Sequence, residues 1–239
     1  MNLVQKLETF DLDKVLDSYF RTLPSRLASF QVNNWAKQPI GCVLWVEKQA
    51  LISVLEKWVS ELDIPVTSIR GYDSWTDIYE QTRRLNSILH RGHEKVVVLY
   101  LGDLDPTGKD IDRFLKAALE YFGFTSEQVE FRRLALTEEQ VEKYGLPPRP
   151  EDAETLEKLE NDPRIKKYAG KYIVELDSLV AYAPEQFRSI IVDVVNSVWD
   201  KEVYEEAKEE AEELLNEVED VIGDAVRAAK EKIFKEDES

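Results

Sequence analysis

The chain has 239 residues, a formal net charge of −17 and a single cysteine, a length that suits one α/β domain with a sizeable core and a smaller appendage. One cysteine excludes a disulfide framework, no apolar run is long enough to cross a bilayer, and the N-terminus lacks a signal-peptide pattern, so we expect a cytoplasmic protein without membrane contact. The acidity argues only weakly against binding of nucleic acid, because residues 200–239, with sixteen acidic and six basic side chains, account for −10 of the charge.

The first half of the chain alternates apolar runs with amphipathic segments. After an N-terminal helical segment over residues 1–38, we expect strands over 41–47, 65–69 and 96–101, which alternate with helices over 48–62, 74–89 and 109–122. The first and third strands show no polar alternation, which is typical of a parallel sheet buried on both faces. This βαβαβα series predicts an α/β fold in which helices flank a Rossmann-like parallel sheet.

The second half is less regular. We expect further strands over 129–136 and 172–177, and helices that begin at Thr137, where Gln140 completes the spacing of a capping box, and at Pro184. The polar stretch 151–171 is predicted to be an excursion or lid. A long helix over 201–234 carries one apolar seam, which packs either on its own domain or against a second helix, as in a homodimer. The expected divisions are therefore 1–38, 39–199 and 200–239.

The most informative motif follows the third strand. Asp103 and Asp105 stand one residue apart in a turn closed by Pro106, Thr107 and Gly108. Ligands bind outside the carboxyl ends of parallel strands, and carboxylate oxygens suit a hard divalent cation. Acidic pairs in turns are common, so this motif alone is weak evidence for a metal site.

A second acid, Glu47, occupies the same place at the end of the first strand. Two strand-end acids in adjacent βα units face each other across a topological switch point, which strengthens the prediction of a metal site. The alternative interpretation is that Glu47 stabilises the first turn of the next helix through the helix dipole and needs no metal.

Three other motif interpretations use the same residues. The segment Asp103–Thr107 is locally similar to the opening motif of aspartate-nucleophile phosphatases, although we find no convincing later acidic pair. An EF-hand loop that begins at Asp103 fails, because its twelfth position is Phe114 rather than glutamate. A phosphate-binding P-loop is excluded by the glycine spacing and by Asp110, which replaces the required serine or threonine.

Six motifs in order carry a resemblance to a known family: Trp35–Pro39, Leu44–Lys48, Arg70–Tyr72, Tyr100–Gly108, Leu146–Pro150 and Val174–Leu179. Together they resemble the Toprim domain of type IIB topoisomerase (topoisomerase VI) A subunits, and more closely the stand-alone Toprim proteins of phages, plasmids and archaea. The resemblance spans about residues 33–199.

The resemblance implies Mg²⁺-dependent phosphodiester chemistry on nucleic acid, with DNA as the expected partner and Mn²⁺ as an alternative metal. It assigns Glu47 as general acid or base and metal ligand, and Asp103 and Asp105 as metal ligands. Lys48 and Arg70 are candidate contacts to nucleic acid, although an exposed arginine in a turn explains Arg70 equally well.

One departure from the family affects the mechanism. Only 46 residues precede Glu47, too few for the winged-helix domain that supplies the nucleophilic tyrosine of the topoisomerases. Two options follow: a nuclease that uses water, or a topoisomerase-related enzyme whose partner subunit supplies the winged-helix or ATPase function. The alternatives outside this class are a non-catalytic metal- or DNA-binding assembly module and a small-molecule phosphatase.

Overall fold

The computed structural model describes residues 32–69, 75–148 and 173–235 of the chain. Residues Lys37–Lys201 form one compact unit that contains the sheet, and the C-terminal helix from Glu202 onward belongs to a second unit. The predicted lid at 151–171, the side chain of Arg70 and most of the predicted N-terminal helical segment lie outside the described residues.

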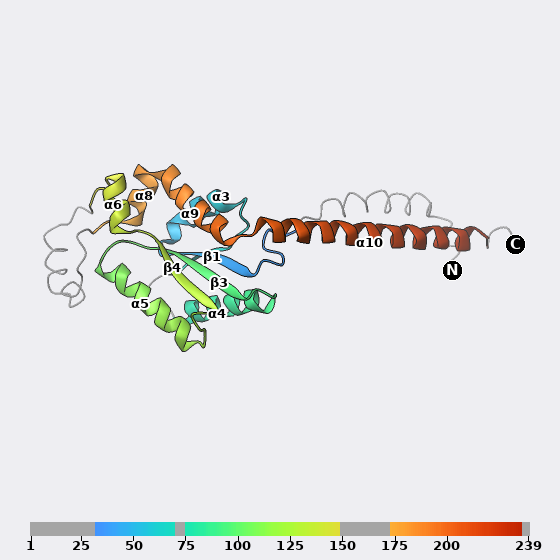
Figure 1. Cartoon of the computed structure of the whole chain (residues 1–239), viewed down its shortest axis with the longest axis horizontal. Helices are drawn as coiled ribbons and strands as arrows, with labels where there is room; N and C mark the ends of the chain where they lie inside the picture. The colour runs from blue at the N-terminus through green and yellow to red at the C-terminus, as the bar shows by residue number, and fades with distance from the viewer. Residues whose placement is uncertain (1–31, 70–74, 149–172, 236–239) are drawn as a thin grey trace, which may run out of the picture. The chain divides into compact units, whose positions relative to one another are not determined.

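In the described part of the chain, four parallel strands form one sheet (Figure 1). In sheet order they are β2 (Val66–Ser68), β1 (Ile40–Val46), β3 (Lys95–Leu101) and β4 (Val129–Ala135). The chain runs outward from β1 to β2, returns to β3 on the other side of β1, and continues to β4. The predicted α/β class with a Rossmann-like parallel sheet is confirmed, and the switch point lies between β1 and β3.

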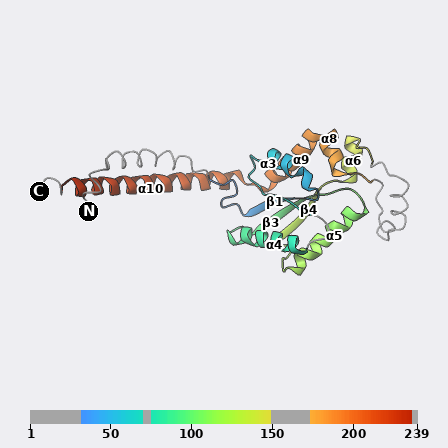
Figure 2. The same cartoon turned by 180° about the vertical axis from the view of Figure 1, so that it is seen from behind.

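Helices cover both faces of the sheet, as the two opposite views show (Figure 1, Figure 2). On one face lie α4 (Trp75–His90) and α5 (Pro106–Tyr121), and on the other α3 (Ile52–Val59) and α9 (Pro184–Val198). The described helical elements also include the 3₁₀ turn Gln49–Leu51, α6 (Glu138–Tyr144), α8 (Leu176–Tyr182) and α10 (Lys201–Lys235).

Both faces of the inner strands are buried. Trp45 of β1 and Tyr100 of β3, which are 2% and 0% exposed, join the core cluster that also contains residues of α4 and α5. On the opposite side, the rings of Trp58 in α3 and Phe187 in α9 meet edge to face with centroids 5.6 Å apart. Because successive strand residues point to opposite faces, this double burial explains why the sequence of β1 and β3 is apolar throughout.

Side-chain caps set the start of two helices. Asp105 accepts a hydrogen bond from the Gly108 amide at 2.6 Å, so α5 begins at Pro106 rather than at the predicted residue 109. The predicted capping box of α6 is confirmed: Thr137 Oγ1 accepts from the Gln140 amide at 3.2 Å, and Gln140 Oε1 accepts from the Thr137 amide at 3.0 Å.

The predicted strand at 172–177 is wrong. Among the described residues of that segment, only Val174 forms a bridge, antiparallel to Leu104, and α8 begins at Leu176. The apolar residues that indicated a strand are buried for another reason, because Val174 pairs with the loop after β3 while Leu176 and Leu179 form the buried side of α8. The segment therefore closes over the strand ends instead of extending the sheet.

The C-terminal helix α10 agrees closely with the predicted helix over 201–234. Its apolar seam is not buried as a whole: Ala207 is 5% exposed, whereas Leu214 and Val221 are 61% and 68% exposed. Within the described ranges, no helix, α10 included, combines the length and apolar character that a membrane-crossing segment requires.

Candidate functional site

The candidate site lies at the carboxyl ends of β1 and β3, where these inner strands part. Val46 and Leu101 are the last paired residues of the two strands, and the Glu47 amide donates to the Leu101 carbonyl at 2.9 Å. Glu47 and Asp103 therefore leave neighbouring strands at the same edge of the sheet. This is the position at which parallel α/β sheets bind ligands.

Glu47 reaches across the switch point to the turn after β3. Its Oε2 atom accepts a hydrogen bond from the Asp103 amide at 3.0 Å and lies 3.5 Å from the hydroxyl of the buried Tyr100. Burial, helped by the negative charges of Asp103 and Asp105, raises the pKa of Glu47 to about 7 although the Asp103 amide acts in the opposite direction. Glu47 can therefore gain or lose a proton near neutral pH.

Asp103 is fixed by the segment that leads into α8. Its Oδ1 atom accepts a hydrogen bond from the Leu176 amide at 2.8 Å, and the adjacent residues Leu104 and Val174 exchange two backbone hydrogen bonds at 2.9 and 3.0 Å. Burial raises the pKa of Asp103 above its ordinary value, against the Leu176 amide and the Lys48 ammonium, which lower it. A carboxylate held in this way is oriented before any ligand arrives.

Lys48 places a positive charge among three carboxylates. Its Nζ atom forms ion pairs with Glu175, with Asp177 at 3.0 Å and with Asp103 at 3.5 Å. Burial lowers the pKa of Lys48, but the hydrogen bonds to Glu175 and Asp177 outweigh this effect and raise the pKa above its ordinary value. Lys48 therefore stays protonated and links the end of β1 to the start of α8.

Arg133 of β4 holds the backbone of the turn that carries the two aspartates. Its guanidinium donates to the carbonyl oxygens of Asp103, Gly102 (3.2 Å) and Leu136 (3.1 Å), and pairs with Asp112 of α5 at 2.7 Å. The side chain is only 15% exposed. Arg133 thus ties β3, β4 and α5 together directly behind the carboxylates.

Two glycines allow this close packing. A Cβ atom at Gly102 would lie 2.9 Å from Glu47 Oε2 and 2.8 Å from the Tyr100 hydroxyl. A Cβ atom at Gly108 would overlap the Asp103 carbonyl oxygen. Positions 102 and 108 therefore require glycine, because the neighbouring atoms leave no space for a Cβ atom.

We expect Gly102→Ala to displace the Glu47 carboxylate and to lower the free energy of unfolding by about 1–3 kcal/mol, because the buried Tyr100 ring cannot retreat. Urea denaturation measures the change. Gly223→Ala in α10 is the control, because a Cβ atom there meets nothing within 4 Å. If Gly102→Ala has the same free energy of unfolding as the wild type, this account of the turn is wrong.

Comparison with known proteins finds no match to this chain among protein-family models, curated proteins or solved structures. What the chain does must therefore be inferred from the residues of its site.

The carboxylates fit a hard divalent cation by their chemistry. In Glu47, Asp103 and Asp105, one oxygen accepts a main-chain hydrogen bond, while the second oxygen accepts none from the described residues. Three oriented carboxylates with a spare oxygen are a suitable donor set for Mg²⁺ or Mn²⁺. Among the described residues, however, no three Asp, Glu, His or Cys side chains are already grouped closely enough to hold an ion.

The structure brings most of the predicted site residues together. Glu47 accepts a hydrogen bond from the Asp103 amide and Lys48 pairs with Asp103 at the strand ends, whereas Asp105 caps α5 and Arg70 lies outside the described residues. The sequence-based prediction missed the role of Arg133 and the pairing of Lys48 with Glu175 and Asp177. Glu175 is the cap residue of α8, and both acids pair with Lys48.

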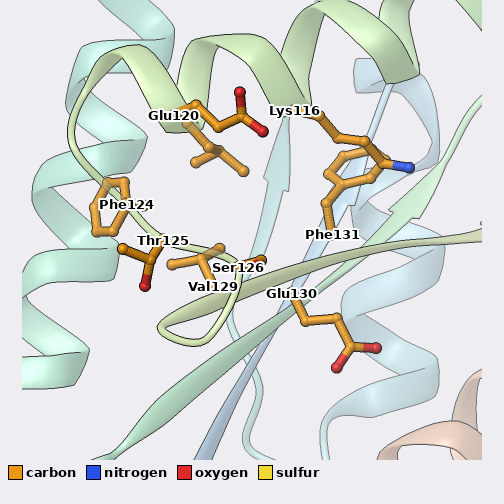
Figure 3. A pocket seen from close by; sticks show the side chains of 9 residues that line it. Lys116, Glu120, Phe124, Thr125, Ser126, Val129, Glu130 and Phe131 are labelled. Carbon is orange, nitrogen blue, oxygen red and sulfur yellow. The ribbon is translucent and has the colours of Figure 1, made fainter.

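A separate hollow of about 220 Å³ lies between α5 and β4 (Figure 3). Its lining includes Lys116 and Glu120 of α5, Thr125 of the following turn and Phe131 of β4, and the Lys116 ammonium lies 5.6 Å from the centre of the Phe131 ring. The hollow contains none of the strand-end acids, so it does not form part of the candidate site.

Proposed function

We propose that this chain is a Toprim-like enzyme that catalyses metal-dependent phosphodiester chemistry on nucleic acid, with DNA as the substrate. The observation that carries the proposal is the contact between Glu47 and the Asp103 amide across the switch point, together with the pKa of Glu47 near 7. This contact places Glu47, which can accept or donate a proton, beside Asp103, whose carboxylate suits a divalent cation.

Each residue has a chemical role in this proposal. Asp103 and Asp105, joined by Glu47, would hold Mg²⁺ or Mn²⁺, and the bound cation would stabilise charge on the phosphate oxygens. Glu47 accepts the proton of the attacking group or donates one to the leaving oxygen. Arg133 contributes by keeping the aspartate turn in place through its carbonyl oxygens.

Water is the nucleophile that suits the described residues. Tyr100, whose hydroxyl lies 3.5 Å from Glu47, is 0% exposed and cannot reach a phosphate without unfolding the strand. A nuclease reaction therefore agrees better with this site than a covalent tyrosyl intermediate formed on Tyr100. A partner subunit that supplies a tyrosine is the topoisomerase-related variant of the same proposal.

Cleavage of supercoiled plasmid by the purified chain tests this function. We expect nicked or linear products with Mg²⁺ or Mn²⁺, none with EDTA, and loss of product in the Asp103→Asn, Asp105→Asn double variant. The asparagine side chains keep an oxygen to accept the main-chain hydrogen bonds, so circular dichroism should show a folded control. If the plasmid stays intact with both metals, the proposal that this chain cleaves DNA without a partner is wrong.

A non-catalytic assembly module is the second candidate. Two observations favour it: Lys48 already neutralises part of the acid cluster, and Leu214 and Val221 of α10 remain exposed for a partner helix. This candidate predicts binding of DNA or metal without turnover, which a gel-shift assay on the same samples measures.

Simple phosphate esters serve as the test substrates for the phosphatase alternative.

A further inference from the structure

Lys48 occupies the place where a positive charge is needed when the site holds no metal. Its side chain is 19% exposed, and its ammonium contacts Asp103, Glu175 and Asp177, which come from the turn after β3 and from the α8 segment. Three carboxylates therefore surround one ammonium, and the Lys48 charge offsets part of their negative charge.

A divalent cation at Asp103 and the Lys48 ammonium compete for the same negative charge. The ammonium lies 3.5 Å from Asp103 Oδ1, so a metal on the other oxygen of that carboxylate would stand within a few ångströms of it. Like charges at such a separation repel strongly in a partly buried site, because little water screens them. The two cations cannot occupy their best positions together.

We propose that Lys48 is an internal counter-ion that closes the site, and that a divalent metal loads only by displacing the Lys48 ammonium from Asp103. This inference rests on the proposed function, because it concerns how the metal site of that function is controlled. The displaced ammonium then lies beside the metal, still within reach of Glu175 and Asp177, where it can bind a phosphate oxygen. Metal binding is thereby coupled to exposure of a cationic contact for nucleic acid.

The first test measures metal affinity without activity. Binding of Mn²⁺ to the full chain is followed by the loss of the electron paramagnetic resonance signal of free Mn²⁺. We expect Lys48→Gln to bind Mn²⁺ at least about tenfold more tightly than the wild type, because the repulsion is removed. Lys48→Arg keeps the charge and is expected to stay within about threefold of the wild type.

Lys95→Gln is the matched control. Lys95 is 31% exposed and pairs with Glu130 at 2.6 Å, but it lies at the opposite end of β3 from the site. Its removal changes the net charge by the same amount, so we expect unchanged Mn²⁺ affinity. A general charge effect would instead tighten binding equally in both glutamine variants.

The second test uses the wild-type chain and does not depend on folding of a variant. Acetylation of lysines, read by mass spectrometry, is expected to modify Lys48 several-fold faster with saturating Mn²⁺ than without it. The rate at Lys95 serves as the reference. An unchanged Lys48 rate in the metal-loaded chain would overturn displacement.

The outcomes separate this inference from the proposed function. If the wild type binds Mn²⁺ and Lys48→Gln binds it equally or less tightly, the counter-ion role is wrong while the metal site stands. If only Lys48→Gln binds Mn²⁺, Lys48 blocks the site, as proposed. If folded wild type and Lys48→Gln both fail to bind Mn²⁺, the proposed metal-dependent function fails, and this inference with it.

Discussion

Glu47→Gln is expected to abolish most of the proposed activity, with a fall in the rate of plasmid cleavage by a factor of about 10²–10⁴. Glutamine keeps an oxygen for the Asp103 amide, so the geometry of the switch point is preserved. It cannot accept or donate the proton, and its amide is a poorer metal ligand. Steady-state cleavage rates measured across pH 5–9 check this result.

The same substitution is expected to stabilise the metal-free protein above neutral pH. Burial raises the pKa of Glu47 to about 7, from an unfolded value of 4.5, so stability falls as the pH rises from 4.5 towards 7 and stays lower above it. Glutamine removes this penalty, which is on the order of 3 kcal/mol at pH 8. The gain should shrink as the pH falls and disappear below the unfolded pKa.

Glu130→Gln provides a control with the opposite sign. Hydrogen bonds from Lys95 and Arg132 lower the pKa of Glu130, so its ionised form supports folding at neutral pH. We expect this variant to lose stability at pH 7, with the loss fading as the pH falls through the lowered pKa of Glu130. Urea midpoints of the two variants at pH 8, at pH 4.5 and at a pH below the lowered pKa of Glu130 measure both trends. Equal pH trends would contradict the assigned environment of Glu47.

Arg133→Met is expected to lower the free energy of unfolding by about 3–5 kcal/mol, because it leaves Asp112 and several carbonyl oxygens without their partner in a largely buried place. Methionine fills part of the space but donates no hydrogen bond. Chemical denaturation measures the loss. Metal binding should weaken as well, because Arg133 holds the carbonyls of Gly102 and Asp103.

Arg113→Met is the matched comparison for Arg133→Met. Arg113 pairs with Asp110 of the same helix, α5, at 2.8 Å, but its side chain is 69% exposed. An exposed ion pair contributes little to stability, so we expect no measurable change in the free energy of unfolding. If both arginine variants lose the same stability, burial is not the cause.

Local patterns predicted most of the fold. The unbroken apolar residues of β1 and β3 indicated strands buried on both faces, and Thr137 with Gln140 indicated the start of α6. The segment around Val174 has a similar apolar pattern but pairs with the loop after β3, so its partner rather than its own sequence decides its structure. A local sequence pattern does not predict such long-range pairing.

In the candidate site too, local patterns predicted some features and missed those that depend on long-range contacts. The rule that ligands bind at strand ends was enough to predict that Glu47 lies against the turn that carries Asp103 and Asp105. Two partners of Lys48, Glu175 and Asp177, follow it by more than a hundred residues, and no spacing rule connects them to it. Arg132 and Arg133 are adjacent and chemically identical, yet Arg132 pairs with Glu130 while Arg133 supports the aspartate turn. Only the direction of each side chain from β4 distinguishes them.

The order of synthesis gives the closing segment Val174–Asp177 a further consequence. A ribosome releases β1, β3 and β4 before this segment, so the Leu176 amide and the carboxylates of Glu175 and Asp177 are synthesised only after the strands whose ends they contact. Until then Lys48 has only Asp103 as a partner among the residues it contacts in the finished site. The ionic closure of the strand ends is therefore a late event in biogenesis, because it waits for a segment made after the whole sheet.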